Sequence, residues 1–178
     1  MKKGDETRKK ILDKGFELAS TLGLECLSIG ALAEATQMSK SGLFAHFLSK
    51  ENLQLKVMEH AGEVFNQVVI VPALKTPAGI QRIRKIMENW VQWTIDLSGG
   101  CIFVAAAAEY SDRPGLVQDF IIEQQNAWIG CLERIAKSAV SVGEFRSDTH
   151  CRVFAFELYS LILGFFSVPQ LSKISGCG

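Results

Sequence analysis

The sequence predicts an all-α protein in which an N-terminal three-helix helix-turn-helix domain is joined to a larger helical domain. Apolar residues recur at helical spacing through most of the 178 residues, and no segment shows the alternation of a strand. Serines precede several of these apolar runs at positions suited to helix N-caps. Helices are short in the first fifty residues and longer afterwards. We therefore place the domains at residues 1–50 and 51–178, with a connecting helix from about residue 50.

The first predicted helix covers "DETRKKILDKGFELASTLG" and ends at Gly23. Its apolar face consists of Ile11, Leu12, Phe16, Ala19 and Leu22. Ser28, Ser39 and Ser49 are expected to cap the next three helices. The second and third of the four helices are short, and the fourth is predicted to run to about Pro72.

The second predicted domain contains longer helices. Thr76 and Pro77 are expected to open a helix over "AGIQRIRKIMENWVQWTIDL", because proline is favoured at the first helical position. The run "SGG" ends this helix, and a short helix of mostly small residues, "CIFVAAAAEY", follows it. Two further helices are predicted at about residues 114–142 and 148–167, separated by "VGEFRSD".

Composition narrows the possible functions. The formal net charge is zero, so any basic surface for nucleic acid has to be local. The charged N-terminus lacks the apolar stretch of a signal peptide, and no span has the roughly 20 apolar residues of a membrane helix. We therefore expect a cytoplasmic protein without a membrane partner. Five scattered cysteines without a C-x-x-C pair predict free, mostly buried thiols, and neither a metal site nor a cofactor is expected.

The second and third predicted helices form a helix-turn-helix arrangement, whose second helix is expected in the major groove of double-stranded DNA. Ser39, Ser41 and Gly42 begin that helix with side chains small enough for a close approach to phosphates and base edges. Lys50 lies at the start of the following helix, where its charge could bind a phosphate. Two residues on one face would anchor the recognition helix from behind, Leu43 and Phe47.

The segment "LSIGALAEATQMSKSGLFAHFLSKENL", residues 27–53, resembles the DNA-binding signature of the TetR family of bacterial transcriptional regulators. The matching positions are Ser28, Leu32-Ala33, Ser39, Gly42-Leu43, Phe44, His46-Phe47 and Ser49-Lys50-Glu51. The resemblance implies an all-helical homodimer with one DNA-reading head per subunit, and a C-terminal domain that holds a small-molecule pocket and the dimer interface. It also implies contacts to bases or the adjoining backbone by Lys40, Ser41 and Phe44, and to phosphates by Ser28, Ser39, Gly42, His46 and Lys50.

Three positions depart from the family pattern. The turn usually reads Ala-Gly-Val, whereas here it is Thr36-Gln37-Met38, so Gln37 either takes a strained left-handed conformation or reaches DNA itself. Phe44 stands where tyrosine is common, which removes a hydroxyl-to-phosphate bond but keeps the ring for a thymine methyl. Gly30 stands where some relatives have a long side chain, so base contacts from the second helix are expected to be poorer.

The larger domain is rich in aromatic residues suited to an apolar effector pocket, although ordinary core packing is the alternative for each of them. The candidate lining residues are Met87, Trp90, Trp93, Phe103, Glu109, Tyr110 and Phe120. Trp90 and Trp93 lie three residues apart on one predicted helix and are expected to share a wall. Glu109, set among alanines, is the candidate partner for a cationic effector.

The last two predicted helices suit a dimer interface, because a helix that is apolar nearly all round needs more partners than one subunit readily supplies. The candidate interface residues are Val117, Ile121, Trp128, Leu132, Phe154, Leu158, Ile162 and Phe165. A central helix of a monomer is the alternative. A two-fold dimer would place its recognition helices about 34–36 Å apart, and its operator would be a pseudo-palindrome.

The interpretation that best accounts for these features is a dimeric, ligand-responsive transcriptional regulator that represses rather than activates, and not an enzyme. A catalytic reading would rest on His150-Cys151, which has no evident orienting group, and no phosphate loop or metal-ligand spacing accompanies it. A thiol-reactive or oxidant sensor would use Cys101 or Cys131. A helical interaction scaffold would not depend on Lys40 or Lys50.

Overall fold

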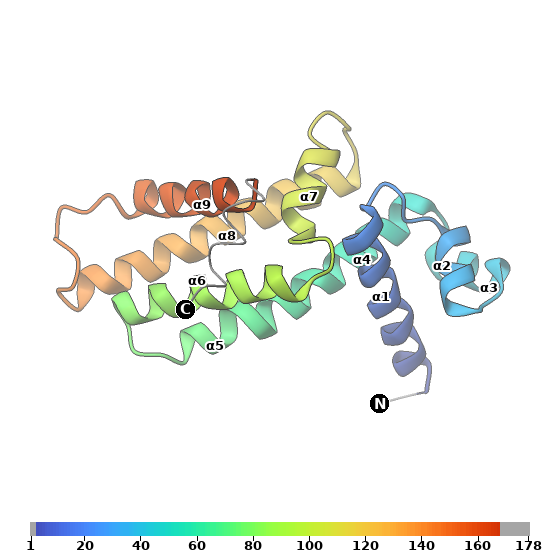
Figure 1. Ribbon diagram of the computed structural model, residues 1–178, viewed down its shortest axis with the longest axis horizontal. Coiled ribbons are helices and arrows are strands. Elements are labelled where there is room, and N and C mark those ends of the chain that lie inside the picture. The colour runs from blue at the N-terminus through green and yellow to red at the C-terminus, as the bar shows by residue number, and fades with distance from the viewer. Residues whose placement is uncertain (1–2, 168–178) are drawn as a thin grey trace. The chain divides into compact units, whose positions relative to one another are not determined.

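The computed structural model describes residues 3–167, and every regular element in this range is helical, as the sequence predicts (Figure 1). The elements are α1 (Lys3–Leu22), α2 (Ile29–Thr36), α3 (Lys40–Phe47), α4 (Lys50–Phe65), a π-helical segment (Asn66–Ile70), α5 (Val71–Leu74), α6 (Ile80–Asp96), α7 (Ile102–Glu109), α8 (Leu116–Ser141) and α9 (Cys151–Ser167). None of the described helices is long and apolar enough to cross a membrane.

The chain forms two compact units. The first contains the residues up to Val68 together with Val91–Gln124, and the second contains Val69–Trp90 together with the residues after Gln124. The division falls inside the π-helical segment, α6 and α8. It does not follow the boundary expected near residue 50, because α4 packs against α1 and α3 and so belongs with them.

Helices α1 to α4 enclose the core of the first unit, to which α7 and the start of α8 also contribute (Figure 1). The fully buried side chains of this core include Leu32, Leu43, Leu53, Val57 and Met58. α1 and α4 approach closely at Gly15, where an added Cβ would lie 2.7 Å from Cγ2 of Val57. This packing holds α2 and α3 as a fixed pair beside α1 and α4.

The three serine caps form where the sequence predicts them. The hydroxyl oxygen of Ser28 accepts a hydrogen bond from the amide of the third residue of α2. Ser39 and Ser49 do the same at the starts of α3 and α4, with oxygen-to-nitrogen distances of 3.1 and 3.0 Å. Each bond satisfies an amide that has no partner within its helix, so the three starts are specified locally.

The fourth helix does not continue as a regular α-helix to Pro72. It becomes π-helical at Asn66–Ile70 and resumes as the short helix α5, in which Pro72 occupies the first turn. In an uninterrupted α-helix the ring of Pro72 would clash with the carbonyl four residues earlier and remove a hydrogen bond. The wider π turn before it is the expected accommodation of such a residue.

The start of α6 differs from the prediction. Thr76 and Pro77 lie in the preceding turn, where the hydroxyl of Thr76 donates to the carbonyl of Ala73 over 2.7 Å. The helix begins at Ile80, whose amide donates to the carboxylate of Glu144. A side chain 64 positions away therefore supplies the cap that the sequence predicts from the local Thr-Pro pair.

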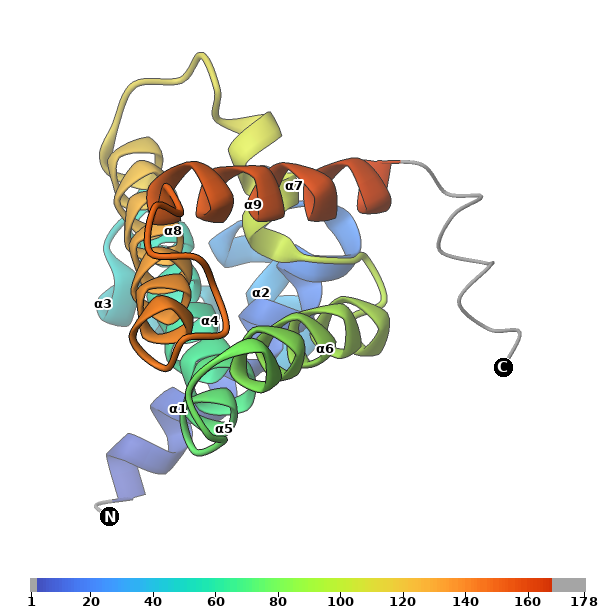
Figure 2. The same ribbon diagram turned by 90° about the vertical axis from the view of Figure 1, so that its left-hand side faces the viewer.

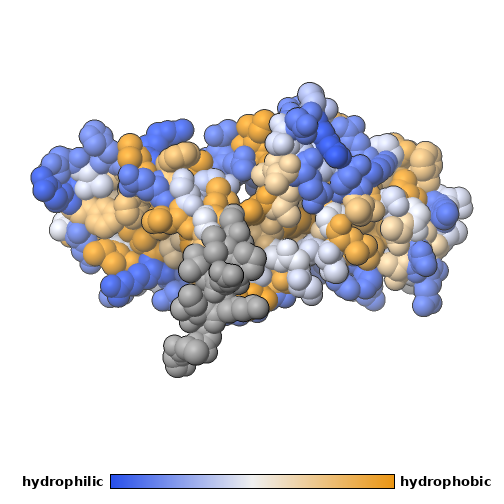
Figure 3. All heavy atoms as spheres, turned by 45° about the horizontal axis from the view of Figure 1, so that its top comes forward, coloured by the Kyte–Doolittle hydropathy of each residue, from blue (hydrophilic) through white to orange (hydrophobic). Residues whose placement is uncertain are grey.

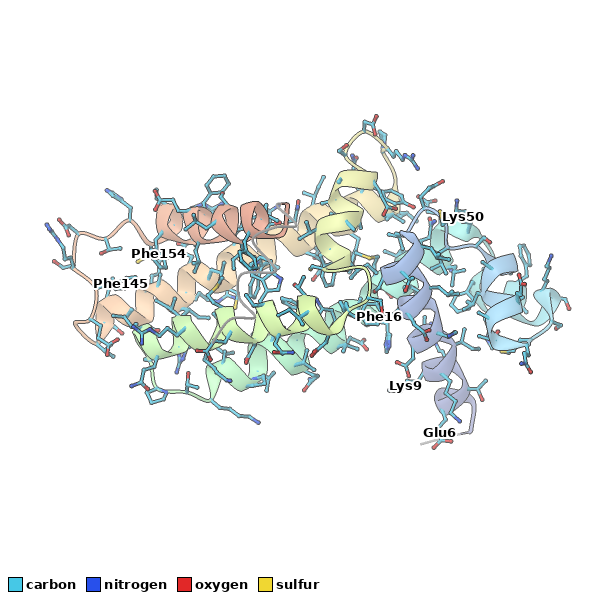
Figure 4. All side chains as sticks on the ribbon, in the orientation of Figure 1. Glu6, Lys9, Phe16, Lys50, Phe145 and Phe154 are labelled. Carbon is cyan, nitrogen blue, oxygen red and sulfur yellow. The ribbon has the colours of Figure 1, made fainter. Side chains whose placement is uncertain are left out.

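In the second unit, α9 crosses α8 (Figure 2). Gln125 donates to the hydroxyl of Tyr159, and Arg152 forms an ion pair with Glu133 over 3.3 Å. At the connection between the two helices, the rings of Phe145 and Phe154 meet edge to face with centroids 5.0 Å apart (Figure 4). These contacts fix α9 on α8 near its N-terminal half.

Candidate nucleic-acid interface

Helix α3 exposes a polar and aromatic face and buries an apolar one. Leu43 is fully buried and Phe47 is 1% exposed, so both anchor the helix as the sequence predicts. Of the nine residues predicted to contact DNA, Ser28 and Gly42 are half-buried at their helix starts. The other seven are exposed: Gln37, Ser39, Lys40, Ser41, Phe44, His46 and Lys50. A short helix that is anchored by its apolar face can present its exposed face to a DNA groove.

Lys40 lies over the beginning of α2. A Cβ added to Gly30 would lie 3.8 Å from Cε and 3.9 Å from Nζ of Lys40. These are ordinary van der Waals distances, so the lysine side chain packs along α2 beside Gly30.

The turn between α2 and α3 contains the left-handed residue that the sequence predicts. Gln37 has φ 56° and ψ 28°, and Met38 donates its amide to the carbonyl of Ala33 over 3.1 Å. This bond from the residue after the left-handed one back to the last turn of the helix is typical of a helix C-terminus that would usually hold glycine. The side chain of Gln37 is exposed beside α3.

The turn between α3 and α4 contains a second unusual residue, which sequence reasoning missed. Leu48 has φ 64° and ψ −36°, and the amide of Ser49 donates to the carbonyl of Phe47 over 2.7 Å. This is the geometry of a sterically unfavourable three-residue turn. Asn52 supports it by donating from Nδ2 to the same carbonyl over 2.8 Å. Leu48 is 65% exposed, and an apolar residue directly before the capping Ser49 was the only signal in the sequence.

Lys50 is exposed at the start of α4 beside the loop that joins α1 to α2 (Figure 4). Its Nζ donates to Oε1 of Glu25 over 3.0 Å, and Oε2 of Glu25 binds Arg113 over 2.9 Å and the hydroxyl of Tyr110 over 3.1 Å. The bond from Lys50 is the main cause that holds the pKa of the Glu25 carboxyl below its usual value. Burial, and then the neighbouring Glu25, raise the pKa of Tyr110 far above its usual value. Nothing local in the sequence indicated these contacts of Lys50.

Glu109 does not fit the role of a partner for a cationic effector. Its carboxylate accepts the amides of Leu24, over 3.3 Å, and Glu25, over 2.8 Å. Both oxygens are thus committed to holding the loop between α1 and α2. Tyr110, the next residue, is 7% exposed and engaged with Glu25.

The two tryptophans of α6 do not share a wall. Trp90 stacks on Tyr159 and meets Trp128 edge to face, in the second unit. Trp93 stacks on Phe16 and meets Phe65 edge to face, in the first unit. Residues three apart on a helix point about 60° from each other, which is enough to reach different clusters.

The other predicted pocket residues also divide between these surroundings. Phe103 meets Phe65 edge to face with centroids 5.7 Å apart, so it extends the cluster around Trp93. Phe120 packs partly buried against the core of the first unit. Met87 is half-buried on α6 in the second unit. The residues predicted to line the effector pocket therefore do not surround a single site.

Half of the residues predicted to form a dimer interface lie inside their own subunit. The enclosed ones, each at most 8% exposed, are Val117, Ile121, Trp128 and Leu132. Side chains enclosed in this way have little surface left for a partner. The remaining four are half-buried on α9: Phe154, Leu158, Ile162 and Phe165. The exposed apolar residues of α9 are instead Val153, Phe156 and Leu161.

The thiols offer little support for a sensor. Cys101, Cys131 and Cys151 are buried, Cys26 is exposed, and Cys177 lies outside the described residues. Burial raises the pKa of Cys131, which lowers its thiolate fraction. Cys151 donates weakly to the carbonyl of Thr149, next to His150.

Among residues 3–167, no group of three or more His, Cys, Asp or Glu side chains is placed to hold a metal ion.

Comparison with known proteins agrees with this arrangement. Residues 11–57 match the family described as bacterial regulatory proteins, tetR family, and residues 79–175 match the tetracyclin repressor-like C-terminal domain. No curated protein sequence matches the chain.

Several solved structures share the fold. A TetR family transcriptional regulator from Cytophaga hutchinsonii is 21% identical with a TM-score of 0.82, and the match covers 97% of this chain and 88% of that one. A TetR regulator from Chloroflexus aurantiacus is 20% identical with a TM-score of 0.82, over 97% and 91% of the two chains. AibR in complex with isovaleryl coenzyme A and operator DNA is 23% identical with a TM-score of 0.71, over 89% and 85%. The two matched regions extend over most of the sequence, and the chain belongs to the TetR family of transcriptional regulators.

Proposed function

We propose that this chain is a cytoplasmic transcriptional repressor that binds a pseudo-palindromic operator as a homodimer and is released by a small-molecule effector. The observation that carries the proposal is α3, which buries Leu43 and Phe47 and exposes Lys40, Ser41 and Phe44 on its outer face. Lysine and serine donors suit phosphates and base edges, and an exposed phenylalanine suits a thymine methyl.

The charge distribution supports a DNA contact that is local. The chain has as many acidic as basic residues, so its overall field does not attract DNA. Lys40 and Lys50, at the starts of α3 and α4, are both exposed, and both helix starts add amide dipoles that favour an anion. AibR and CifR, which share the fold, have been solved with operator DNA.

The exposed side of α9 supports a second copy of the chain as partner. Val153, Phe156 and Leu161 are 54, 60 and 71% exposed, and an added Cβ at Gly164 would meet no atom within 4 Å. Apolar side chains also interrupt the hydrophilic surface on the face of the molecule shown in Figure 3. Exposed apolar residues that recur along one helix are typical of a surface covered in the assembled protein, and the family's two-fold symmetry would bring this helix against itself.

The aromatic cluster of the first unit supports an effector site. Trp93, Phe16, Phe65 and Phe103 form a continuous set of ring contacts from four helices. The indole N–H of Trp93 is buried without a hydrogen-bond acceptor among the described residues. Such a donor suits an apolar effector that carries one acceptor group. Relatives of this fold have been solved with isovaleryl coenzyme A and with choline, which are chemically unlike each other, so they do not select an effector class.

The experiment that tests this function is operator selection with the purified protein. Random-sequence selection, followed by titration of the selected duplex and a scrambled one at two salt concentrations, would yield a pseudo-palindrome bound by two subunits. The Lys40→Ala, Lys50→Ala variant should lose most of this affinity, and each lost phosphate contact should lower the salt slope by about 0.9. Equal, weak binding of both duplexes by wild type and variant would leave a helical scaffold as the better reading.

A further inference from the structure

A single carboxylate connects the end of α7 with the proposed DNA interface. Glu25, in the loop between α1 and α2, binds Lys50 through Oε1 and both Tyr110 and Arg113 through Oε2. Tyr110 directly follows α7, and Arg113 lies in the loop before α8. All four residues belong to the first unit. Lys50 is a proposed phosphate ligand, whereas the two residues on the other oxygen are not in the helix-turn-helix.

The loop that carries Glu25 is itself held from both sides. From α7, Glu109 accepts the amides of Leu24 and Glu25. From α4, the buried side chain of Gln54 donates to the carbonyl of Leu24 over 2.8 Å. Gly23 allows the close fit, since it has φ 90° and an added Cβ would lie 2.9 Å from Oε1 of Glu109. A displacement of the end of α7 would therefore be transmitted to Glu25.

The side chains that bind Glu25 carry more positive charge than Glu25 neutralises. One carboxylate, Glu25, lies between two cations, so the three side chains of Glu25, Lys50 and Arg113 together carry one positive charge; the carboxylate of Glu109 on the same loop is bound to backbone amides. Without Arg113 the sum would be zero, and Oε2 of Glu25 would keep only the neutral hydroxyl of Tyr110, so Glu25 would attract Lys50 more strongly. A neutralised lysine beside an anion has little attraction for a phosphate.

We propose that Glu25 is the positioning residue through which the end of α7 controls whether Lys50 can bind a DNA phosphate. With Arg113 and Tyr110 bound to Oε2, Glu25 holds Lys50 through Oε1 alone, and Lys50 can exchange this one bond for a DNA phosphate. When they withdraw, Glu25 retains Lys50 and the affinity for the operator falls. This inference rests on the proposed function, to which it adds a route from the effector-responsive body to the DNA interface.

The test measures operator affinity by fluorescence anisotropy for the full chain and a set of variants. Arg113→Gln is expected to weaken binding roughly two- to fivefold, the range for an exposed ion pair, whereas Arg113→Lys keeps the charge and should weaken it less. Tyr110→Phe should also weaken binding, because it removes the hydroxyl that binds Oε2 of Glu25. Glu25→Gln should bind at least as tightly as wild type. Arg146→Gln is the matched control, because it removes the same charge from an exposed ion pair in the second unit.

Two readouts separate positioning from a general loss of structure. In the Glu25→Gln background, Arg113→Gln should have no further effect, because the group it restrains is gone. In the wild-type background, Arg113→Gln should also reduce the slope of log affinity against log salt by up to about 0.9, toward that of Lys50→Met. Circular dichroism and thermal unfolding establish that each variant is folded.

The outcomes that overturn the inference are distinct from those that overturn the function. If Arg113→Gln weakens binding equally with and without Glu25, the arginine acts on DNA directly and the inference fails. It also fails if wild type binds its operator and Arg113→Gln behaves like the Arg146→Gln control. If wild type selects no sequence at all, the proposed function fails and the inference with it.

Discussion

Gln37 occupies a backbone conformation that disfavours side chains other than glycine. Its φ of 56° lies in the left-handed region, which costs an L-residue roughly 1–2 kcal/mol. Gln37→Gly should therefore raise the free energy of unfolding by about 0.5–1 kcal/mol, measured by urea denaturation. Gln37→Ala is the control, since it removes the amide but keeps the strain, and should not gain stability. If the alanine variant is as stable as the glycine one, the conformation is not strained.

Phe44 and Phe47 separate function from stability within one helix. Phe47 is 1% exposed and Phe44 is 54% exposed. Phe47→Ala should lower the free energy of unfolding by about 3–5 kcal/mol, whereas Phe44→Ala should lower it by less than about 1 kcal/mol. Operator titration should give the opposite order for the folded variants, with Phe44→Ala clearly weakened. Equal destabilisation by the two substitutions would contradict the packing of α3.

Among the helices, the sequence predicts the start correctly where the capping residue lies next to the helix in the chain. Ser28, Ser39 and Ser49 cap helices within three residues of themselves, so the sequence pattern was sufficient. The start of α6 was placed too early because its cap comes from Glu144, which is remote in sequence. Pro72 indicates that α4 is interrupted near this residue. It does not indicate that the interruption takes the form of a π-helical turn.

Helices α1 and α4 are joined by Asp13, whose Oδ1 lies 2.7 Å from Nε2 of the buried His60. Partial burial acts to raise the pKa of Asp13, but hydrogen bonds with Lys9 and His60 outweigh it, so the pKa lies below its usual value. A carboxyl with a lowered pKa adds stability above its unfolded pKa, near 3.8, and this stability is lost as the pH falls through the folded value.

Asp13→Asn should therefore cost stability at neutral pH and little in strong acid. Because the carboxylate is 45% exposed, solvent screening limits the expected loss to about 0.5–1 kcal/mol. Urea denaturation at pH 7 and below pH 3 would measure the difference. Glu17→Gln is the control, because it removes a carboxylate of α1 that pairs with Lys14 and is more exposed, at 65%. A loss for Asp13→Asn that persists unchanged in acid would show that the charge is not responsible.

For the molecule as a whole, the family and the exposed face of α3 could be predicted because they depend on a contiguous segment. The connection of Lys50 through Glu25 to Tyr110 and Arg113 could not, since it joins residues up to 88 positions apart with no shared pattern. The separation of Trp90 from Trp93 likewise depends on which side chains the two units bring to α6. The burial of the predicted dimer residues on α8 within their own subunit could not be foreseen, because apolar periodicity marks burial without distinguishing a subunit core from an interface.

The exposed side of α9 gives the last prediction. If a second copy covers it, Phe156→Glu together with Leu161→Glu should convert the dimer to a monomer in analytical ultracentrifugation, because each buries a charge against an apolar surface. Val142→Glu is the control, since Val142 is an apolar residue of similar exposure, 51%, that follows the end of α8 and is not part of α9.

Loss of the dimer should affect DNA far more than stability. The substituted side chains are exposed within the subunit, so circular dichroism should still report a folded helical protein. A monomer reads one half-site at a time, and without the second head held at high effective concentration its operator affinity should fall by roughly 100-fold or more. A double variant that stays dimeric, and binds the operator as the Val142→Glu control does, would place the interface on another surface.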